Sequence, residues 1–109
     1  MKSGIAKPNT PPLLPRRARE SSKRDYGRLL ILAGSRGYTG APSFASRAAV
    51  RGGAGLVWLG VPESIYAVTA VKNDEAMPFP LPCDAQGRLT AEALPEVEAR
   101  LERMSCLAI

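Results

Sequence analysis

The hydrophobic pattern of the chain changes at residue 28. Residues 29–33 read Leu-Leu-Ile-Leu-Ala, a continuous apolar run that Gly34 closes, and residues 56–61 form a second such run behind a cluster of glycines. Strands that are buried on both faces of a parallel sheet have this pattern. We therefore predict two buried strands.

The segment between these runs has the spacing of a helix. Pro42 suits the first helical turn, and Gly52 suits the end of the helix because glycine readily adopts the left-handed conformation found there. The positions expected to face the sheet share the i, i+3, i+4, i+7 spacing and are Ala41, Phe44, Ala45 and Ala48. Strand, helix and strand in this order predict a right-handed βαβ unit with parallel strands.

The second half of the chain predicts two more helices. Residues 62–72 place Ile65, Val68 and Lys72 on one weakly amphipathic stripe. A further helix is expected to begin at Pro95, because proline is tolerated in the first turn of a helix and breaks it further in.

Two other segments predict extended structure. Residues 77–82 alternate apolar residues with prolines, which excludes a helix and a central strand and leaves an edge strand or a loop. Residues 106–109 resemble the opening of another buried strand. This strand is either the open edge of an incomplete domain or a strand in the middle of the sheet.

The net charge of +5 belongs to the amino-terminal leader. Residues 1–28 hold eight Lys and Arg against two Asp and Glu, whereas residues 29–109 hold seven against eight. Residues 1–22 are rich in proline and arginine and bury too little apolar surface to offset their ordering entropy, so we expect a disordered leader before a folded unit at 23–109. No aromatic residue interleaves with the basic residues of the leader, so we expect no nucleic-acid partner.

The cysteines and the hydropathy define the broad class of protein. Cys83 and Cys106 form no CxxC pair and the chain has no histidine, so we expect neither a zinc site nor a disulfide framework. No apolar run approaches the roughly 18 residues that a membrane-spanning helix needs. We expect a cytoplasmic protein with no membrane partner.

The glycine-rich turn at residues 34–40 is the candidate binding element. Its GxxGxxG spacing matches neither the Walker A loop nor the dinucleotide GxGxxG fingerprint. Glycines still let backbone N–H groups approach a ligand, and the helix that follows offers its positive end to an anion such as a pyrophosphate. An ordinary tight turn explains the glycines equally well, and no acid pair or activated serine provides a catalytic residue.

Several motifs in a fixed order resemble the bacterial NAD(P)H-hydrate dehydratase family. They cover most of the chain after the leader and are Lys23-Arg-Asp-Tyr-Gly-Arg28, Leu29-Leu-Ile-Leu-Ala-Gly-Ser35, Tyr38-Thr-Gly-Ala-Pro42, Ala48-Ala-Val-Arg-Gly-Gly-Ala-Gly-Leu-Val57, Val61-Pro62 and Asp74-Glu-Ala-Met-Pro-Phe-Pro-Leu81. The resemblance implies a ribokinase-like three-layer α/β/α sandwich with a mostly parallel sheet, of which this chain is a truncated part. It also implies removal of water from hydrated NADH or NADPH (NADHX or NADPHX), with ADP or ATP as co-substrate and Mg²⁺.

The resemblance also suggests which residues bind the hydrated cofactor. In the family the Gly-Ala pair after the glycine turn lines that site, which corresponds to Gly40 and Ala41 in this sequence. Ala41 is the strongest candidate, because a small residue lets the nicotinamide nucleotide reach the backbone. The remaining wall is expected from the neighbouring turn residues Gly34, Ser35, Tyr38 and Thr39.

The chain also departs from the family pattern. It has Ser22-Lys23-Arg24-Asp25 where the family commonly has His-Lys-Gly-Asp, and it contains neither the later Gly-Pro-Gly loop nor the Gly-Thr-Gly-Asp motif. The latter supplies the family's catalytic aspartate and nucleotide cradle, so we expect an inactive fragment with one wall of the site and no catalytic or metal-binding residue. Whether the complete protein forms a homo-oligomer stays open.

Two alternative functions stay open beside the dehydratase. One is a carbohydrate or small-molecule kinase of the ribokinase-like superfamily, and the other is a nucleotide-binding module without catalysis. The kinase differs from the dehydratase in the part absent from this sequence. The binding module would bind NADPH or AMP without turnover.

We predict that the leader, residues 1–22, is dispensable for folding, because its prolines and arginines contribute no core. Limited trypsin digestion under native conditions should therefore cut rapidly after Arg16, Arg17 and Arg19. Resistance at any of these arginines would show that the leader is docked on the folded unit.

Overall fold

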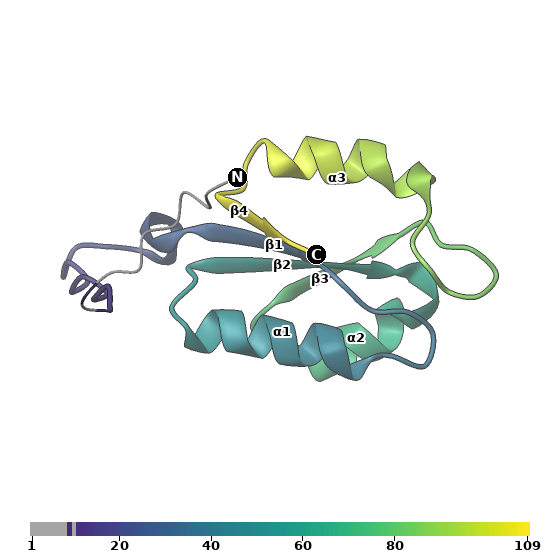
Figure 1. The fold of residues 1–109 in the computed structure, drawn as a ribbon, viewed down its shortest axis with the longest axis horizontal. Coiled ribbons are helices and arrows are strands. Elements are labelled where there is room, and N and C mark those ends of the chain that lie inside the picture. Colours follow the sequence, from purple (N-terminus) through teal and green to yellow (C-terminus); the bar gives the residue numbers. More distant parts are fainter. Residues whose placement is uncertain (1–8, 10) are drawn as a thin grey trace.

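The strands form one parallel sheet (Figure 1). The computed structural model describes residues 9 and 11–109. The strands it contains are β1 (Arg28–Leu32), β2 (Leu56–Pro62), β3 (Met77–Leu81) and β4 (Cys106–Ala108). Their order is β3-β2-β1-β4, and each neighbouring pair is parallel. The carboxyl ends of all four strands therefore lie along the same edge of the sheet.

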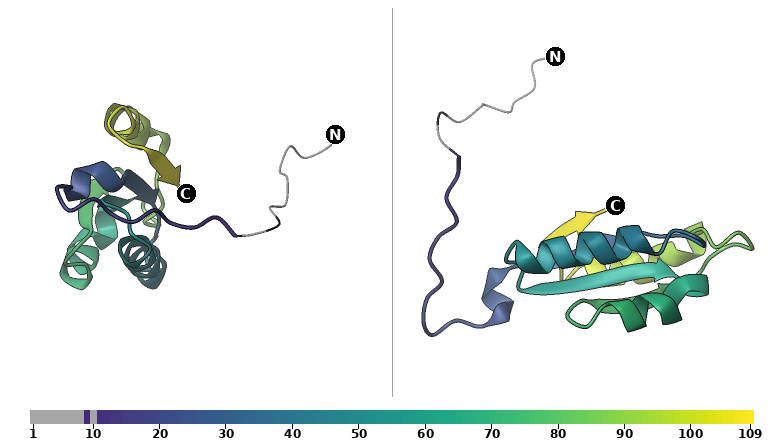
Figure 2. Two further views of the ribbon diagram at one scale, coloured as in Figure 1. Left: turned by 90° about the vertical axis from the view of Figure 1, so that its left-hand side faces the viewer. Right: turned by 90° about the horizontal axis from the view of Figure 1, so that it is seen from below.

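Helices cover both faces of this sheet. On one face lie α1 (Gly40–Arg51) and α2 (Tyr66–Lys72), and on the other lies α3 (Leu94–Leu101), as Figures 1 and 2 show. Short 3-10 turns precede β1, α2 and α3, and they are η1 (Lys23–Tyr26), η2 (Glu63–Ile65) and η3 (Ala91–Ala93). The predicted α/β class with a parallel sheet and three layers is confirmed.

The core consists of two clusters, one on each face of the sheet. Successive residues of β1 alternate between them, so that Leu30 packs on the α3 side and Ile31 on the side of α1 and α2. The buried members on the α1 side are Ile31, Val57, Leu59, Val61, Ile65 and Ala76. Those on the α3 side are Leu30, Phe79, Leu81, Ala93 and Val97. Burial on both faces explains the continuous apolar runs of β1 and β2.

The direction of the chain across the sheet reverses beside β1. From β1 the chain passes through α1 to β2 and through α2 to β3, always toward the same side of the sheet. From β3 it returns through α3, on the opposite face, to β4 on the far side of β1. The strand order therefore changes direction between β1 and β4.

The face of α1 that packs on the sheet differs from the prediction. Ala41, Phe44, Ala45 and Ala48, which were expected to face the sheet, are all exposed, and Phe44 is 74% exposed. The buried residues of α1 are instead Pro42, Ser43 and Ser46.

Hydrogen bonds to α2 explain this rotation of α1. The Ser46 hydroxyl donates to Asn73 Oδ1 at 2.7 Å, and Asn73 Nδ2 donates to Ser43 Oγ at 3.3 Å. Asn73 Nδ2 also donates to the Thr69 carbonyl at 2.8 Å. Buried polar groups cost little when they are hydrogen-bonded, so Ser43 and Ser46 lie on the inner face together with the partly buried Ala49 and Val50.

The other two helices also differ from the prediction, α2 in its start and its buried face and α3 in its start. Strand β2 continues through Pro62, so α2 begins at Tyr66, and it buries Thr69 while Val68 is 49% exposed and Lys72 is exposed. The predicted stripe of the second helix was therefore wrong beyond Ile65: Thr69 takes the buried position, and its hydroxyl is satisfied by donating to the Ile65 carbonyl at 2.9 Å. Helix α3 begins at Leu94, one residue before the predicted start.

The two uncertain extended segments are both edge strands. Strand β3 lies at one edge of the sheet, as the prolines predicted, and β4 lies at the other. The alternative of a carboxyl-terminal strand in the middle of the sheet is wrong, because Cys106 and Ala108 are exposed.

The described part of the leader touches the folded unit through Arg17. Its guanidinium donates to the Gly53 carbonyl at 2.8 Å and lies 4.0 Å from the centre of the Tyr26 ring. This contact of Arg17 differs from the expectation of a free leader, although residues 11–20 are otherwise exposed. The leader prediction for residues 1–8 and 10 falls outside the described residues.

Gly55 connects two segments that are distant in sequence. Its N–H donates to the carbonyls of Tyr26 at 3.0 Å and Gly27 at 3.1 Å. A Cβ at this position would overlap the backbone carbonyl of Lys23. The turn η1 therefore packs directly on the glycine cluster that precedes β2.

We predict that Gly55→Ala destabilises the fold by about 1–3 kcal/mol, because two backbone segments must separate to admit the methyl group. Gly40→Ala is the matched control, since its Cβ would meet only Phe44 Cε2, at an ordinary 3.7 Å. Urea unfolding followed by circular dichroism measures both changes. Equal midpoints for the two variants would show that η1 is not docked as described.

Candidate functional site

The glycine loop connects the carboxyl end of β1 to the amino end of α1. Residues 34–40 therefore lie at the carboxyl edge of the sheet, beside the point where the strand order reverses between β1 and β4. In open parallel α/β sheets this crevice is where ligands bind, because the connections on its two sides leave toward opposite faces. The predicted site thus occupies the position that the topology favours for a ligand.

Close packing around Gly34 shapes the loop. Gly34 has φ +92°, and a Cβ there would lie 2.7 Å from Pro42 Cγ and 2.8 Å from Ile65 Cδ1. The Tyr38 N–H donates to the Ser35 carbonyl at 2.8 Å and closes a tight turn. Gly34 is therefore required by packing between the loop, α1 and η2, whether or not a ligand binds.

The first turn of α1 has no side-chain cap. Thr39 is the N-cap residue, and its side chain makes no capping hydrogen bond. The first N–H groups of a helix have no partner within the helix, and the helix dipole makes this end partly positive. The N–H groups at the start of α1 are therefore available to an anionic group.

The predicted site residues form an open surface. Tyr38 is 71% exposed and Ala41 is exposed, whereas Gly34, Ser35, Thr39 and Gly40 are half-buried. Gly40 has free space around its Cα, with only Phe44 Cε2 within 4 Å of an added Cβ. The assignment of these six residues to a ligand site stays a prediction.

A second turn, which the sequence analysis did not single out, packs on the glycine loop. It connects β3 to η3, and its Gly87 carbonyl accepts the Arg36 N–H at 3.3 Å. Gly87 is buried with φ +74°, and a Cβ there would lie 2.7 Å from Arg36 Cβ and 2.8 Å from Ser64 Oγ. The Asp-x-x-Gly spacing of residues 84–87 is a turn signature, but it does not reveal what the turn touches.

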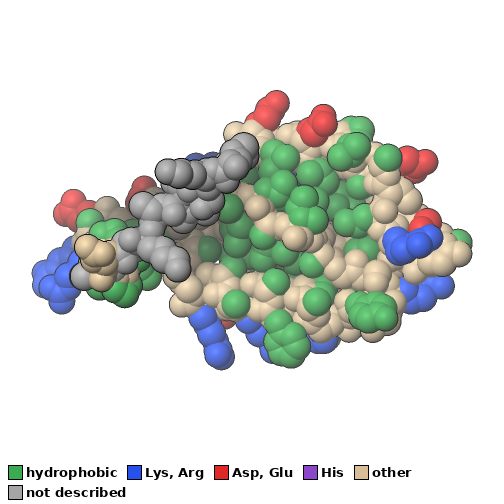
Figure 3. All heavy atoms as spheres, in the orientation of Figure 1, with side chains coloured by type: hydrophobic (Ala, Val, Ile, Leu, Met, Phe, Trp, Pro, Cys, Tyr) green, Lys and Arg blue, Asp and Glu red, His purple; other side chains and the backbone are tan. Residues whose placement is uncertain are grey.

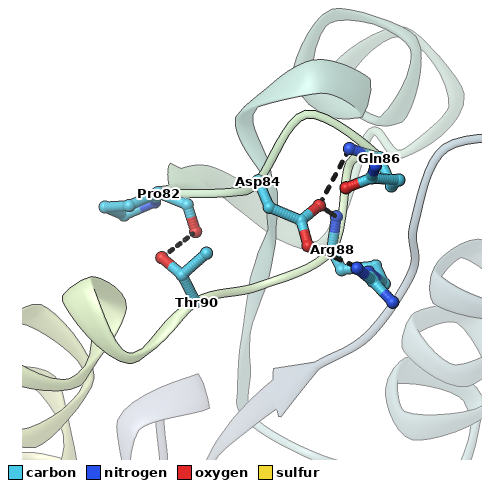
Figure 4. A network of polar contacts seen from close by, with 5 residues as sticks. All are labelled: Pro82, Asp84, Gln86, Arg88 and Thr90. Carbon is cyan, nitrogen blue, oxygen red and sulfur yellow. Dashed lines mark hydrogen bonds and ion pairs between the residues drawn. The ribbon is translucent and has the colours of Figure 1, made fainter.

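Asp84 holds this second turn together (Figure 4). Its Oδ1 accepts the backbone N–H groups of Gln86 at 3.0 Å and Arg88 at 2.9 Å, and its Oδ2 accepts Arg88 Nε at 2.9 Å. The backbone N–H of Arg88 and the Arg88 guanidinium hold the pKa of this carboxyl below its ordinary value, against a smaller opposing effect of desolvation. Asp84 is therefore ionised at neutral pH.

A polar cavity lies at the other end of the molecule. It has a volume of about 150 Å³ and lies between the carboxyl-terminal ends of α1 and α2, near the amino end of β3. Its lining includes Arg47, Arg51, Lys72, Asp74 and Glu75. None of the six predicted site residues lines it, so this cavity is separate from the candidate site.

Residues 9 and 11–109 contain neither a metal-binding cluster nor a membrane-spanning helix. Within them, no three His, Cys, Asp or Glu side chains come together in a group that could hold a metal ion. No helix in the same part of the chain has both the length and the apolar character needed to cross a bilayer.

The fold and the loop at the strand reversal define an open parallel α/β domain with a candidate ligand site, and a solved structure agrees on the fold. A ribokinase-like superfamily protein from Enterococcus faecalis V583 aligns with a TM-score of 0.57 and 22% identity, over 83% of this chain and 37% of that one. Residues 29–109 match the family model described as NAD(P)H-hydrate dehydratase. The chain belongs to this family.

Two relatives illustrate the extent of the match. The bifunctional NAD(P)H-hydrate repair enzyme Nnr of Moorella thermoacetica is 42% identical over 96 residues, which cover 88% of this chain and 18% of that protein. The ADP-dependent (S)-NAD(P)H-hydrate dehydratase of Streptococcus pneumoniae is 46% identical over 65 residues, covering 60% of this chain and 22% of that protein. The chain spans about a fifth of the length of these curated relatives.

Proposed function

We propose that the complete protein dehydrates NADHX or NADPHX with ADP or ATP as co-substrate, and that residues 34–41 form its nicotinamide-nucleotide wall. The observation that carries the proposal is the glycine loop at the strand reversal, which leads into an uncapped helix in a chain of the dehydratase family. Relatives named as NAD(P)H-hydrate repair enzymes and dehydratases support this substrate class.

Each part of the wall has a physical role in this proposal. The uncapped N–H groups at the start of α1 bind a phosphate of the substrate, because they are unpaired donors at the positive end of a helix. Ala41 is exposed and has a small side chain, so it lets the nucleotide approach the backbone. The exposed Tyr38 ring offers a flat apolar surface beside it.

The phosphoryl-transfer part of the site comes from residues beyond this chain in our proposal. The acidic side chains of the described residues do not gather into a group that could hold Mg²⁺. We therefore assign none of the residues of this chain to the metal or to the adenine nucleotide. Binding and positioning of the hydrated cofactor remain as the role of this chain.

The surface beside β4 is the place where those residues can attach. Pro78 and Pro80 leave the outer edge of β3 short of hydrogen-bond donors. The outer edge of β4 carries no proline, and Figure 3 shows hydrophobic side chains gathered on this side of the molecule, between α3 and α1. The exposed Phe44 and Ile109 contribute large apolar side chains to the exposed surface.

The alternatives have weaker support. The family match favours a dehydratase over a carbohydrate or small-molecule kinase. A nucleotide-binding module without catalysis remains the expected behaviour of this chain by itself. A cytoplasmic location fits a substrate made from NADH or NADPH and forms part of the proposal.

We predict that the isolated chain does not dehydrate NADHX, because the cradle for the transferring phosphate is not among its residues. Its circular dichroism melt should also be less cooperative than that of an ordinary domain, since the β4 edge and the exposed face of α1 are uncovered. The assay contains NADHX, Mg²⁺ and either ADP or ATP. Turnover above the uncatalysed rate would place a complete site within these residues.

A chimera tests the proposed wall in an active background. Residues 29–109 replace the corresponding segment of the Moorella thermoacetica repair enzyme, a relative with 42% identity over 96 residues. We expect this chimera to dehydrate NADHX. In it, Ala41→Leu should raise KM at least tenfold, equivalent to about 1.4 kcal/mol, while the unfolding midpoint should move no more than it does for the control substitution on the same side of the helix.

Ala48→Leu is the control for that substitution. Ala48 lies on the same exposed side of α1 as Ala41 but about two turns further from the loop, so its replacement should leave KM unchanged. Equal effects of the two substitutions on KM, or a folded chimera without activity, would contradict the proposed wall.

A further inference from the structure

Packing around Gly34 holds the base of the glycine loop, but few contacts hold its tip, residues 36–38. Gly37, at its tip, has φ +83° and no atom within 4 Å of an added Cβ. The Tyr38 N–H bond to the Ser35 carbonyl is internal to the loop. A loop with this little support exchanges among conformations unless another element holds it. Another element therefore holds the loop in the folded chain.

The turn at residues 82–90 provides that support. The Arg36 N–H donates to the Gly87 carbonyl, which joins the connection after β3 to the connection after β1, although β2 lies between these strands. The approach is close enough that only glycine fits at position 87, against Arg36 Cβ on one side and Ser64 Oγ on another. The Gly87 carbonyl is therefore placed by packing as well as by its hydrogen bond.

Asp84 in turn fixes the position of Gly87. Its carboxylate accepts two backbone N–H groups of the turn, and its own N–H donates to the Arg88 carbonyl at 2.9 Å. The Gly87 N–H donates to the Asp84 carbonyl at 2.9 Å, and the Thr90 N–H donates to the Pro82 carbonyl at 3.3 Å. Figure 4 shows the side chain of Asp84 pointing into the turn that it closes.

We propose that Asp84 is a positioning residue for the nicotinamide-nucleotide wall: it closes the turn that carries Gly87, and Gly87 holds Arg36 and so the glycine loop. This inference rests on the proposed function for the role of the loop. The link from Asp84 to Arg36 is a physical property of the chain that can be measured without any ligand. The backbone bonds of Asp84, more than its pairing with the exposed Arg88, carry the effect, because an exposed ion pair contributes little.

Amide hydrogen exchange of the ¹⁵N-labelled chain tests the link. Asp84→Ala should speed exchange of the Arg36 amide at least tenfold and leave the amides of Leu59 and Val61 in β2 unchanged. Asp74→Ala, at an exposed aspartate outside the turn, is the matched control and should leave Arg36 unchanged. Asp84→Asn and Arg88→Ala should both stay within threefold of the unsubstituted chain, because each keeps an oxygen that accepts the backbone N–H groups.

Several results would overturn the proposal. One is an Arg36 amide that exchanges as fast as an unstructured peptide in the unsubstituted chain, and another is no response to Asp84→Ala. A third is a parallel rise at Leu59 and Val61, which would make Asp84 a determinant of global stability. Gly87→Ala supplies an independent variant, since it leaves Asp84 in place and should still release Arg36.

The chimera separates this inference from the proposed function. In it, Asp84→Ala should raise KM for NADHX at least fivefold with little change in kcat, and Asp84→Asn should restore KM. If Arg36 exchange responds as expected but the chimera does not dehydrate NADHX, the proposed function fails and the positioning link stands. If the chimera is active and its KM does not respond to Asp84→Ala, the positioning proposal fails.

Discussion

The position of β1 between β2 and β4 is the constraint on which the rest of the structure depends. Parallel pairing on both sides buries Leu30 against α3 and Ile31 against the layer of α1 and α2. Parallel strands need crossover connections. The connection that leaves β1 runs through α1 along one face of the sheet, and the connection that reaches β4 runs through α3 along the other face. The reversal places the glycine loop at the edge where open parallel α/β sheets bind ligands, which is why a loop without a known phosphate-binding fingerprint is still a candidate ligand site.

Close backbone contacts at two glycines tie the connections of this sheet together. Gly55 admits the carbonyl of Lys23 at the amino edge of the sheet, and Gly87 admits Arg36 at the carboxyl edge. In both places a side chain would force two backbone segments apart. The segment around Lys23 and the glycine cluster before β2 therefore form one packed unit.

The buried polar contacts between α1 and α2 decide which surface stays open. Ser43, Ser46 and Asn73 hold inward the face of α1 that also carries Ala49 and Val50, so Ala41, Phe44, Ala45 and Ala48 remain exposed. That exposed side and the open edge of β4 are on the part of the molecule where hydrophobic side chains gather in Figure 3. A surface of this kind suits the attachment of further structure, in agreement with the small share of its relatives that the chain spans.

The sequence by itself determined the strands, the glycine turn and the edge position of β3, because apolar runs, glycines and prolines act within a few residues. Its motifs, in their fixed order, also indicated the family to which the chain belongs. Only the tertiary structure decided which side of α1 is buried, because that choice depends on hydrogen bonds between residues about 30 positions apart, such as Asn73 and Ser43. The contact of Gly87 with Arg36 could not be predicted from the sequence either, because two turns separated by a strand meet only after the sheet has formed.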